Sequence, residues 1–273
     1  MSQISNFDKQ LFNSIIMKIL VCISHVPDTT SKINFSDNNT VFDKTGVQFV
    51  INPNDEFGLT RAIWFKEKNN AVVHVINVGL SDTESTLRKA LAIGADKAIR
   101  INHNPKDGHS VAKYISNYIS NNSYDLIIAG RESIDYNGGM VPGMISAFTD
   151  INFIDKCIDL NISGDSVEAS REIEGGKENI STKLPLIIGG QKGLVEESDL
   201  RIPNMRGIMM ARKKELEVVE VNEDYQSTNS KSFEKPLPKG EVTLISADEI
   251  DKLIDLLHNL SLIHISEPTR PQC

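Results

Sequence analysis

The fold is decided by the stretch Val72-Val73-His74-Val75-Ile76-Asn77-Val78-Gly79. A nearly continuous β-branched run predicts a strand that is covered on both faces, as strands are inside a parallel sheet. Gly79 ends the run, and Ser81 with Glu84 predicts a capping box that starts a helix. Gly94 closes that helix before the next apolar run. The segment therefore predicts a strand, a crossover helix and a second strand.

The same alternation extends outward in both directions. Further strands are predicted by apolar runs at residues 18–23, 47–51, 98–101 and 126–129. Helices are predicted after the acidic turn 52–56, where Asn or Asp caps the first turn, and over residues 111–119. Strands that alternate with helices form βαβ units with right-handed crossovers. We expect an α/β fold with a doubly wound, mostly parallel sheet from residue 17 to about residue 148.

The pattern changes in the second half of the chain. Strand-like runs joined by short turns cover residues 157–162, 167–173, 178–182 and 184–188. They predict a β-hairpin layer added to the sheet. Residues 222–238 are polar and lack a period, which indicates an extended arm of the kind that commonly binds a partner. The apolar spacing of residues 247–259 predicts a terminal helix.

Both ends of the chain depart from this organisation. Residues 1–16 have no clear period, and we expect Met17 to be the natural start. Residues 262–271 resemble translated sequencing-adapter read-through, so they are left out of the fold prediction. The predicted organisation is an N-terminal extension (1–16), an α/β domain (17–221), a C-terminal arm with its helix (222–259) and a read-through tail (260–273).

Composition and charge exclude several classes of protein. The 273 residues are 40% hydrophobic and 24% charged, which is typical of a soluble globular protein. A net charge of −8 opposes binding to nucleic acid and to anionic membranes. No apolar run approaches the roughly 20 residues that a membrane span needs. The three cysteines lack CxxC spacing and the N-terminus lacks a secretory signal, so we expect a reducing, cytoplasmic location.

Side-chain catalysis is not predicted. The histidines show no HxxxH or HExxH spacing, which disfavours a metal site. No GxSxG elbow or Cys-His signature supplies a nucleophile.

Ligands in open α/β sheets bind beyond the carboxyl ends of the strands. Four loops qualify, beginning at Ser24, Asn52, Gly79 and Gly130. The last loop, residues 130–139, follows a buried strand and enters a helix, so its N–H groups could receive a phosphate. It matches neither GxGxxG nor a P-loop, and a tight connection without a ligand is the alternative.

Two further segments carry conspicuous side chains. Arg171 and Glu172 lie near a predicted hairpin turn, where a solvated turn is the alternative to a site. Residues 191–214 combine apolar side chains, among them Ile202, with a basic cluster at Arg206, Arg212, Lys213 and Lys214. This segment forms either an adaptable docking surface or a helix that covers the core.

Together these segments resemble the beta subunit of electron transfer flavoprotein, over nearly all of residues 17–259. The family signature corresponds here to Ala169, Arg171, Glu174, Gly175, Gly176, Glu178, Ile180, Pro185, Ile187 and Ile188. Gly189 departs from its final small or polar position. The Asn52-Pro53 pair, residues 90–96 and the loop 130–135 also resemble family landmarks in the correct order.

The resemblance implies an adenine nucleotide alpha hydrolase-like fold and a heterodimer. In that assembly the alpha subunit holds most of an FAD, and the beta subunit buries an AMP. The implied nucleotide-site residues are Cys22, Asn52, Pro53, Asn54, Asp55, Val78, Gly130, Arg131, Glu132, Ser133, Ile134, Asp135, Asn137, Gly138, Gly139, Met140 and Val141. Met140 and Pro142 stand where many members have Gln and Gly, and Pro142 removes one N–H donor.

The resemblance also implies partner contacts. Glu172, with Arg171 beside it, would contact an arginine of the mobile flavin domain, and Ile202, with Pro203 and Asn204, would anchor the chain to acyl-CoA dehydrogenases. The arm would embrace the alpha subunit. Electrons would pass through FAD to a quinone reductase or another acceptor, in processes such as fatty acid oxidation. Two alternatives stay open: an electron-bifurcating subunit with a second FAD in place of AMP and NADH as donor, and a stand-alone adenine-nucleotide sensor.

Overall fold

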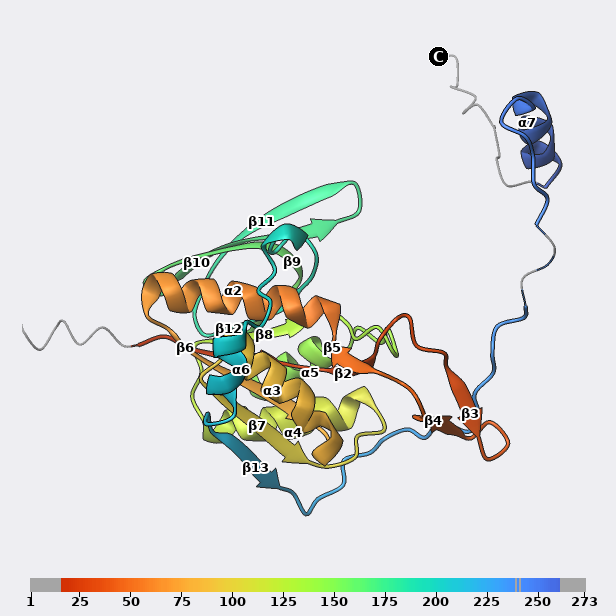
Figure 1. The fold of residues 1–273 in the computed structure, drawn as a ribbon. Helices are drawn as coiled ribbons and strands as arrows, with labels where there is room; N and C mark the ends of the chain where they lie inside the picture. The colour runs from red at the N-terminus through yellow and green to blue at the C-terminus, as the bar shows by residue number, and fades with distance from the viewer. Residues whose placement is uncertain (1–15, 239, 241, 261–273) are drawn as a thin grey trace, which may run out of the picture. The chain divides into compact units, whose positions relative to one another are not determined.

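The computed structural model describes residues 16–238, 240 and 242–260. In these ranges the main sheet has nine strands in the order β11-β10-β9-β12-β8-β1-β6-β7-β13 (Figure 1). Its parallel part includes β12 (Leu186–Gly190), β8 (Leu126–Gly130), β1 (Lys18–Cys22), β6 (Val72–Val78), β7 (Lys97–Asn102) and β13 (Leu216–Glu220). Strand β1 lies between β6 and β8, with Val21 opposite Val75 and Ile128. This confirms the doubly wound α/β fold.

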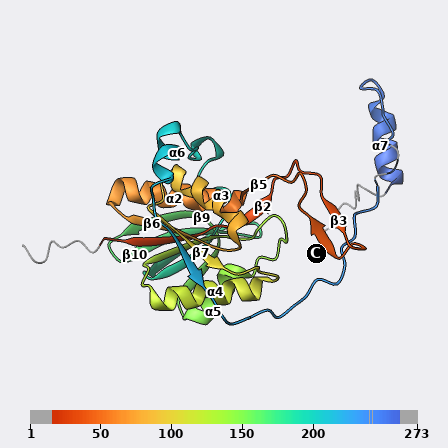
Figure 2. The ribbon, with the colours of Figure 1, turned by 60° about the horizontal axis from the view of Figure 1, so that its bottom comes forward.

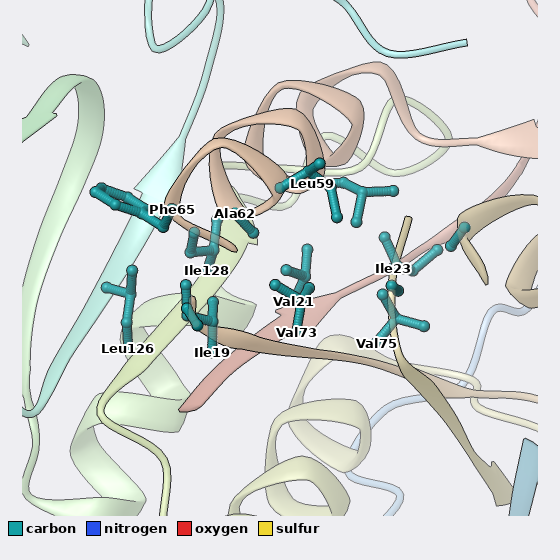
Figure 3. Close-up of a cluster of buried hydrophobic side chains, with 14 of the residues drawn as sticks. Ile19, Val21, Ile23, Leu59, Ala62, Phe65, Val73, Val75, Leu126 and Ile128 are labelled. Atoms are coloured by element: carbon teal, nitrogen blue, oxygen red, sulfur yellow. The ribbon is translucent and has the colours of Figure 1, made fainter. Parts of the chain in front are cut away.

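Helices cover both faces of the sheet (Figure 2). One face packs against α2 (Pro53–Asn69) and α3 (Glu84–Ile93), with α6 (Met205–Ala211) packed on α3. The other face packs against α4 (Gly108–Asn121) and α5 (Val141–Thr149). Successive residues of a strand point to opposite faces, so Ile19 and Val21 join the first core and Leu20 and Cys22 join the second. Figure 3 shows the first core, in which the side chain of Leu59 on α2 lies above β1 and β6.

The predicted start of α3 is wrong in its capping. A single 3₁₀ turn, Ser81–Thr83, precedes the helix, and no side chain caps it. Glu84 does not reach back to Ser81, because its Oε1 accepts a 3.0 Å bond from Nε of Arg100, which is only 6% exposed. Leaving a buried guanidinium without a carboxylate partner costs more free energy than leaving an exposed helix end without a cap.

The predicted hairpins extend the same sheet. Strands β9 (Asn152–Ser163), β10 (Ser166–Ile173) and β11 (Gly176–Lys183) are antiparallel neighbours at its edge. The fourth run, β12, is instead parallel to both β8 and β9 and lies between them. The chain therefore builds the antiparallel strands and then returns to the interior of the sheet.

Strands β2 (His25–Pro27), β3 (Asn34–Ser36) and β4 (Val41–Asp43) were not predicted from the sequence. Strand β3 pairs with β4, and β2 pairs with β5 (Phe49–Ile51). Strand β5 lies within the predicted run 47–51, but it belongs to this separate two-stranded sheet and not to the main one. The β3–β4 turn places Asp37, Asn38 and Asn39 at positive φ, which Asp and Asn tolerate better than most residues. Strand β13 was also not predicted, because Glu217 and Glu220 interrupt its short apolar run. None of the helices in the described ranges is long and apolar enough to cross a membrane.

The contacts divide the chain into two units, residues 1–233 and 234–273. The first part of the predicted arm belongs to the first unit, because Phe233 stacks on Phe35 with ring centroids 4.8 Å apart. In the second unit, α7 (Ile250–Asn259) confirms the predicted terminal helix and leaves Ile250, Leu253 and Ile254 exposed. The predictions for residues 1–15 and 261–273 lie outside the described residues.

Candidate functional site

The carboxyl ends of β1 and β8 are joined by one side chain, that of Asp55 in the first turn of α2. Its Oδ2 accepts the N–H of Ser24 at 2.7 Å, and its Oδ1 accepts the N–H of Gly130 at 2.8 Å. Asp55 is only 2% exposed. The carboxylate therefore fixes the loops that follow two adjacent strands relative to each other.

Burial dominates the chemistry of this carboxyl group. It raises the pKa of Asp55 from 3.8 to about 7, against the opposing effect of the N–H donors. Gly130 is required beside it, because a Cβ there would lie 2.3 Å from Oδ1 of Asp55. The glycine thus allows close approach of the loop to α2.

Asn52 holds the next part of the loop. The sequence predicted a side-chain cap at the start of α2, but the side chain of Asn52 does not cap this helix. Its Nδ2 donates to the carbonyl of Glu132 at 2.9 Å, and its Oδ1 accepts the N–H of Ile134 at 3.2 Å. Asn54 donates to the same carbonyl at 3.1 Å. These bonds satisfy both polar ends of a fully buried amide, which offsets the lost cap.

The outer part of the loop, residues 135–140, is exposed and enters α5. Asn137 has φ 49° and Gly139 has φ 59°, so the backbone turns through left-handed conformations. Within the described part of the chain, the N–H groups of Gly138, Gly139, Met140 and Val141 donate to no other group. Free N–H groups at the start of a helix attract an anion.

A phosphate fits this loop. A Cβ at Gly138 would meet only Cγ of Met140, at 4.0 Å, so a ligand can approach the backbone. Pro142, the second residue of α5, contributes no N–H, which restricts the donors to the residues before it. Ser133 supports the turn by accepting the N–H of Asn137 at 2.8 Å.

Cys22 and Val78 end β1 and β6 on the face covered by α4 and α5. Both are buried, at 7% and 6% exposure, so they offer apolar surface at the edge of the strand ends. Burial raises the pKa of the Cys22 thiol, which keeps the thiol neutral and unreactive. Pro53 is exposed at the start of α2, and Asp135 accepts the N–H of Tyr136 at 2.9 Å within the exposed loop.

A chain of polar side chains connects the hairpin to this loop. Glu172 on β10 accepts from Nε2 of Gln191, and Oε1 of Gln191 accepts from Nη1 of Arg131 at 3.2 Å. Arg131 also pairs with Glu132 at 2.6 Å. Arg171 does not join this chain, because it pairs across the hairpin with Glu178 at 2.6 Å. Gln191 was missed from the sequence; its place directly after the buried strand β12 was the available signal.

The segment before α6 is an exposed apolar surface. Ile202 is 83% exposed, and Met205 and Met209 are 76% and 67% exposed. Asn204 caps α6 by accepting the N–H of Gly207 at 2.7 Å, and Pro203 is half-buried beside it. A helix that covers the core is therefore the wrong interpretation for these side chains.

Helix α6 is nevertheless held firmly. A Cβ at Gly207 would lie 2.3 Å from the carbonyl oxygen of Ala92, so α6 packs directly on the end of α3. Arg88 donates to the carbonyls of Ala211 and Lys214, both at 2.8 Å. Lys214 must be removed from the predicted basic cluster, because its Nζ donates to the carbonyls of Leu91 and Ala95 at the end of α3.

The sheet and the strand-end loops define the class: an open α/β protein whose candidate site faces the carboxyl ends of its parallel strands. A family model described as "Electron transfer flavoprotein domain" matches residues 39–224. The chain is 33% identical over 257 residues to the electron transfer flavoprotein subunit beta of Bacillus subtilis. The matched residues cover 89% of this chain and 98% of that protein. The chain belongs to the electron transfer flavoprotein family, among its beta subunits.

Two further relatives have the same description. The electron transfer flavoprotein subunit beta of Dictyostelium discoideum is 30% identical over 253 residues, covering 90% of this chain and 99% of that protein. The Homo sapiens subunit is 29% identical over 209 residues, covering 74% and 81%. The resemblance found in the sequence is thereby confirmed.

Proposed function

We infer that the chain is the beta subunit of a heterodimeric electron transfer flavoprotein. It binds AMP, forms one wall of an FAD site at the interface with an alpha subunit, and works in the cytoplasm. Electrons pass from a flavin dehydrogenase, such as an acyl-CoA dehydrogenase of fatty acid oxidation, to a quinone reductase or another acceptor. One observation carries the proposal beyond family membership: the loop braced by Asp55 and Asn52 ends in free N–H groups that suit a phosphate.

The AMP site is built from two kinds of surface. The N–H groups of residues 138–141 receive the phosphate, since the start of α5 adds a favourable dipole there. Cys22 and Val78 offer apolar contact for the adenine from the neighbouring strand ends. The buried Asp55 and Asn52 act by holding the loop in place, because their polar atoms are engaged with backbone groups.

FAD supplies the redox chemistry when it is bound, and this chain orients and shields it. Glu172 is an exposed carboxylate at the hairpin, suited to an arginine of the flavin domain. Gln191 already holds one of its oxygens, which restricts the orientation of the carboxylate before a partner arrives. Arg171, paired with Glu178, contributes to the same exposed hairpin surface.

Two apolar surfaces serve protein partners. Ile202, with Pro203 and Asn204, docks with the dehydrogenase, since an exposed aliphatic anchor on a supported loop is a normal hot spot. The arm and the exposed apolar residues of α7 contact the alpha subunit, which removes them from water.

Nucleotide analysis of the co-purified complex tests the proposal. The full chain is co-expressed with the candidate alpha subunit from the same genome, and the purified complex is denatured and extracted. We expect about one FAD and one AMP per heterodimer. Two flavins without AMP would overturn the AMP assignment in favour of the bifurcating form. A chain that purifies alone with an adenine nucleotide would instead support the stand-alone sensor.

A further inference from the structure

A cavity of about 500 Å³ lies between α4, β13 and the first residues of the arm. Its volume falls in the range of small-ligand sites, roughly 300–1,000 Å³. The rings of Tyr114, Tyr118 and Tyr225 line it, together with the carboxylates of Glu217 and Glu223. The loops at the carboxyl ends of β1 and β8 do not contribute to it, so the cavity is distinct from the proposed AMP site.

Three of the four asparagines that line the cavity have acceptor oxygens without a partner among the described residues. The Nδ2 group of Asn117 donates to the hydroxyl of Tyr225 at 3.0 Å, that of Asn121 to the carbonyl of Asn117 at 3.0 Å, and that of Asn122 to the carbonyl of Tyr118 at 2.9 Å. Within the described residues, their Oδ1 atoms accept no bond. Each amide has thus used one of its two N–H groups inside the protein and keeps both lone pairs of its oxygen for a ligand.

The charged groups of the wall have the same character. Glu217 and Glu223 line the cavity, and no Lys, Arg or His is among the described residues that do so. Glu217 is held by Nζ of Lys97 at 2.9 Å and by the hydroxyl of Tyr118 at 3.3 Å. Lys97 also pairs with Glu215, at 2.7 Å, so this single positive charge does not offset the negative charges of both carboxylates. The carboxylate is therefore in position before a ligand enters.

Acceptor oxygens, carboxylates and tyrosine rings together suit one chemistry, a cation with several N–H donors. We propose that this cavity binds an aliphatic guanidinium or ammonium group. The carboxylate of Glu217 and the asparagine oxygens accept its N–H groups, and the tyrosine rings contact its charge and its methylene chain. A cation over an aromatic ring is attracted by the negative face of the ring, and a hydrogen bond to an ionised partner is about twice as strong as a neutral one.

Agmatine is a suitable probe, because it carries both a guanidinium and an ammonium group. Butylurea is its neutral counterpart, with a similar shape and no charge. Nuclear magnetic resonance spectra of the isotope-labelled full chain are recorded during titration with each compound. We expect saturable shifts for agmatine at the amides of Asn117, Asn121 and Val219, and none for butylurea. Absence of saturation, shifts that map elsewhere, or equal binding of butylurea would overturn the proposal.

A matched pair of variants tests the role of the carboxylate. Glu217→Gln and Glu220→Gln each remove one charge from β13, but Glu220 binds Asn102 outside the cavity. We expect the affinity for agmatine to fall roughly tenfold in the first and by about twofold or less in the second. An equal loss in both variants would show that only the general charge of the strand matters, against a specific site. Should Glu217→Gln melt early, the mapping on the unmodified chain decides alone.

Discussion

The buried carboxyl group of Asp55 makes a specific prediction about stability and pH. Because burial raises its pKa from 3.8 to about 7, the folded chain binds this proton more tightly than the unfolded chain does. The contribution of Asp55 to the free energy of unfolding is therefore greatest at low pH. It is lost as the pH rises toward the folded pKa and is constant above it.

The size of the effect follows from the shift in pKa. One pKa unit corresponds to about 1.36 kcal/mol, so a shift of roughly three units is worth about 4 kcal/mol in full. Between pH 5 and pH 8 the expected loss is about 2.5 kcal/mol, since pH 5 already lies above the unfolded pKa. Burial lowers the pKa of His25 and His74, which gives stability changes of opposite sign in part of this range.

The histidines are present in both the native chain and Asp55→Asn, so the difference between their free energies of unfolding reports the pH dependence of the Asp55 carboxyl group alone. Asn keeps one oxygen for one N–H group but turns its NH₂ group toward the other, which costs about 1–3 kcal/mol at every pH. Urea unfolding at pH 5, 6, 7 and 8 gives the difference between the two proteins. We expect the advantage of the native chain to shrink by about 2.5 kcal/mol between pH 5 and pH 8, with most of the loss below pH 7. A difference that is flat, or that grows with pH, would refute the reasoning and show that the N–H groups hold the carboxylate ionised.

Three further substitutions test other parts of the structure. Gly130→Ala places a Cβ 2.3 Å from the Asp55 carboxylate, so urea unfolding should show a loss of about 1–3 kcal/mol, and extraction should show loss of AMP from the complex; full AMP content would contradict the role of the loop. Ile202→Ala should slow reduction by the dehydrogenase about tenfold or more and leave the FAD content intact. Val41→Ala, a similar truncation of an exposed side chain on β4, should leave the rate of reduction unchanged. Loss of FAD from Ile202→Ala would show that the loop is misassigned. In the native chain Asp107 caps α4 through one oxygen and accepts the N–H of Ser227 at 2.6 Å through the other. Asp107→Asn keeps the oxygen for the cap but turns its NH₂ group toward Ser227, so hydrogen exchange of the Ser227 amide should become roughly tenfold faster. Unchanged protection of this amide would show that Asp107 does not hold the arm.

The parallel core could be predicted because its signal is local. A run such as residues 126–129 is apolar at every position and only four residues long before Gly130, which is typical of a strand covered on both faces. The ends of such runs then indicate where a ligand binds, without any knowledge of side-chain contacts. The candidate loop at residues 130–139 was predicted in this way, whereas the exposed segment around Ile202 was predicted from its apolar side chains beside a basic cluster.

The remaining features depend on partners that are distant in the sequence. The spacing of Ser81 and Glu84 predicts a capping residue at Glu84, but the carboxylate of Glu84 accepts a hydrogen bond from Arg100 on the next strand. Asn52 and Asp55 have the composition of a helix start, yet their side chains bind backbone groups of residues 130–134, on another strand-end loop. Strand β13 is recognisable only through its pairing with β7, since its glutamates suggest a solvated segment. Local propensity does not predict which buried polar group would cost the most free energy if it were left without a partner.

The position of β12 has a consequence for synthesis of the chain. Strands β8 and β9 are separated in the sheet by β12, although β12 is made after β9, β10 and β11. While the chain emerges from the ribosome, β8 keeps an unpaired inner edge until residues 186–190 arrive. The three antiparallel strands have no place on the sheet until the same moment. An open edge attracts other strands, so the nascent chain is most exposed to misassembly just before these five residues fill the place between β8 and β9.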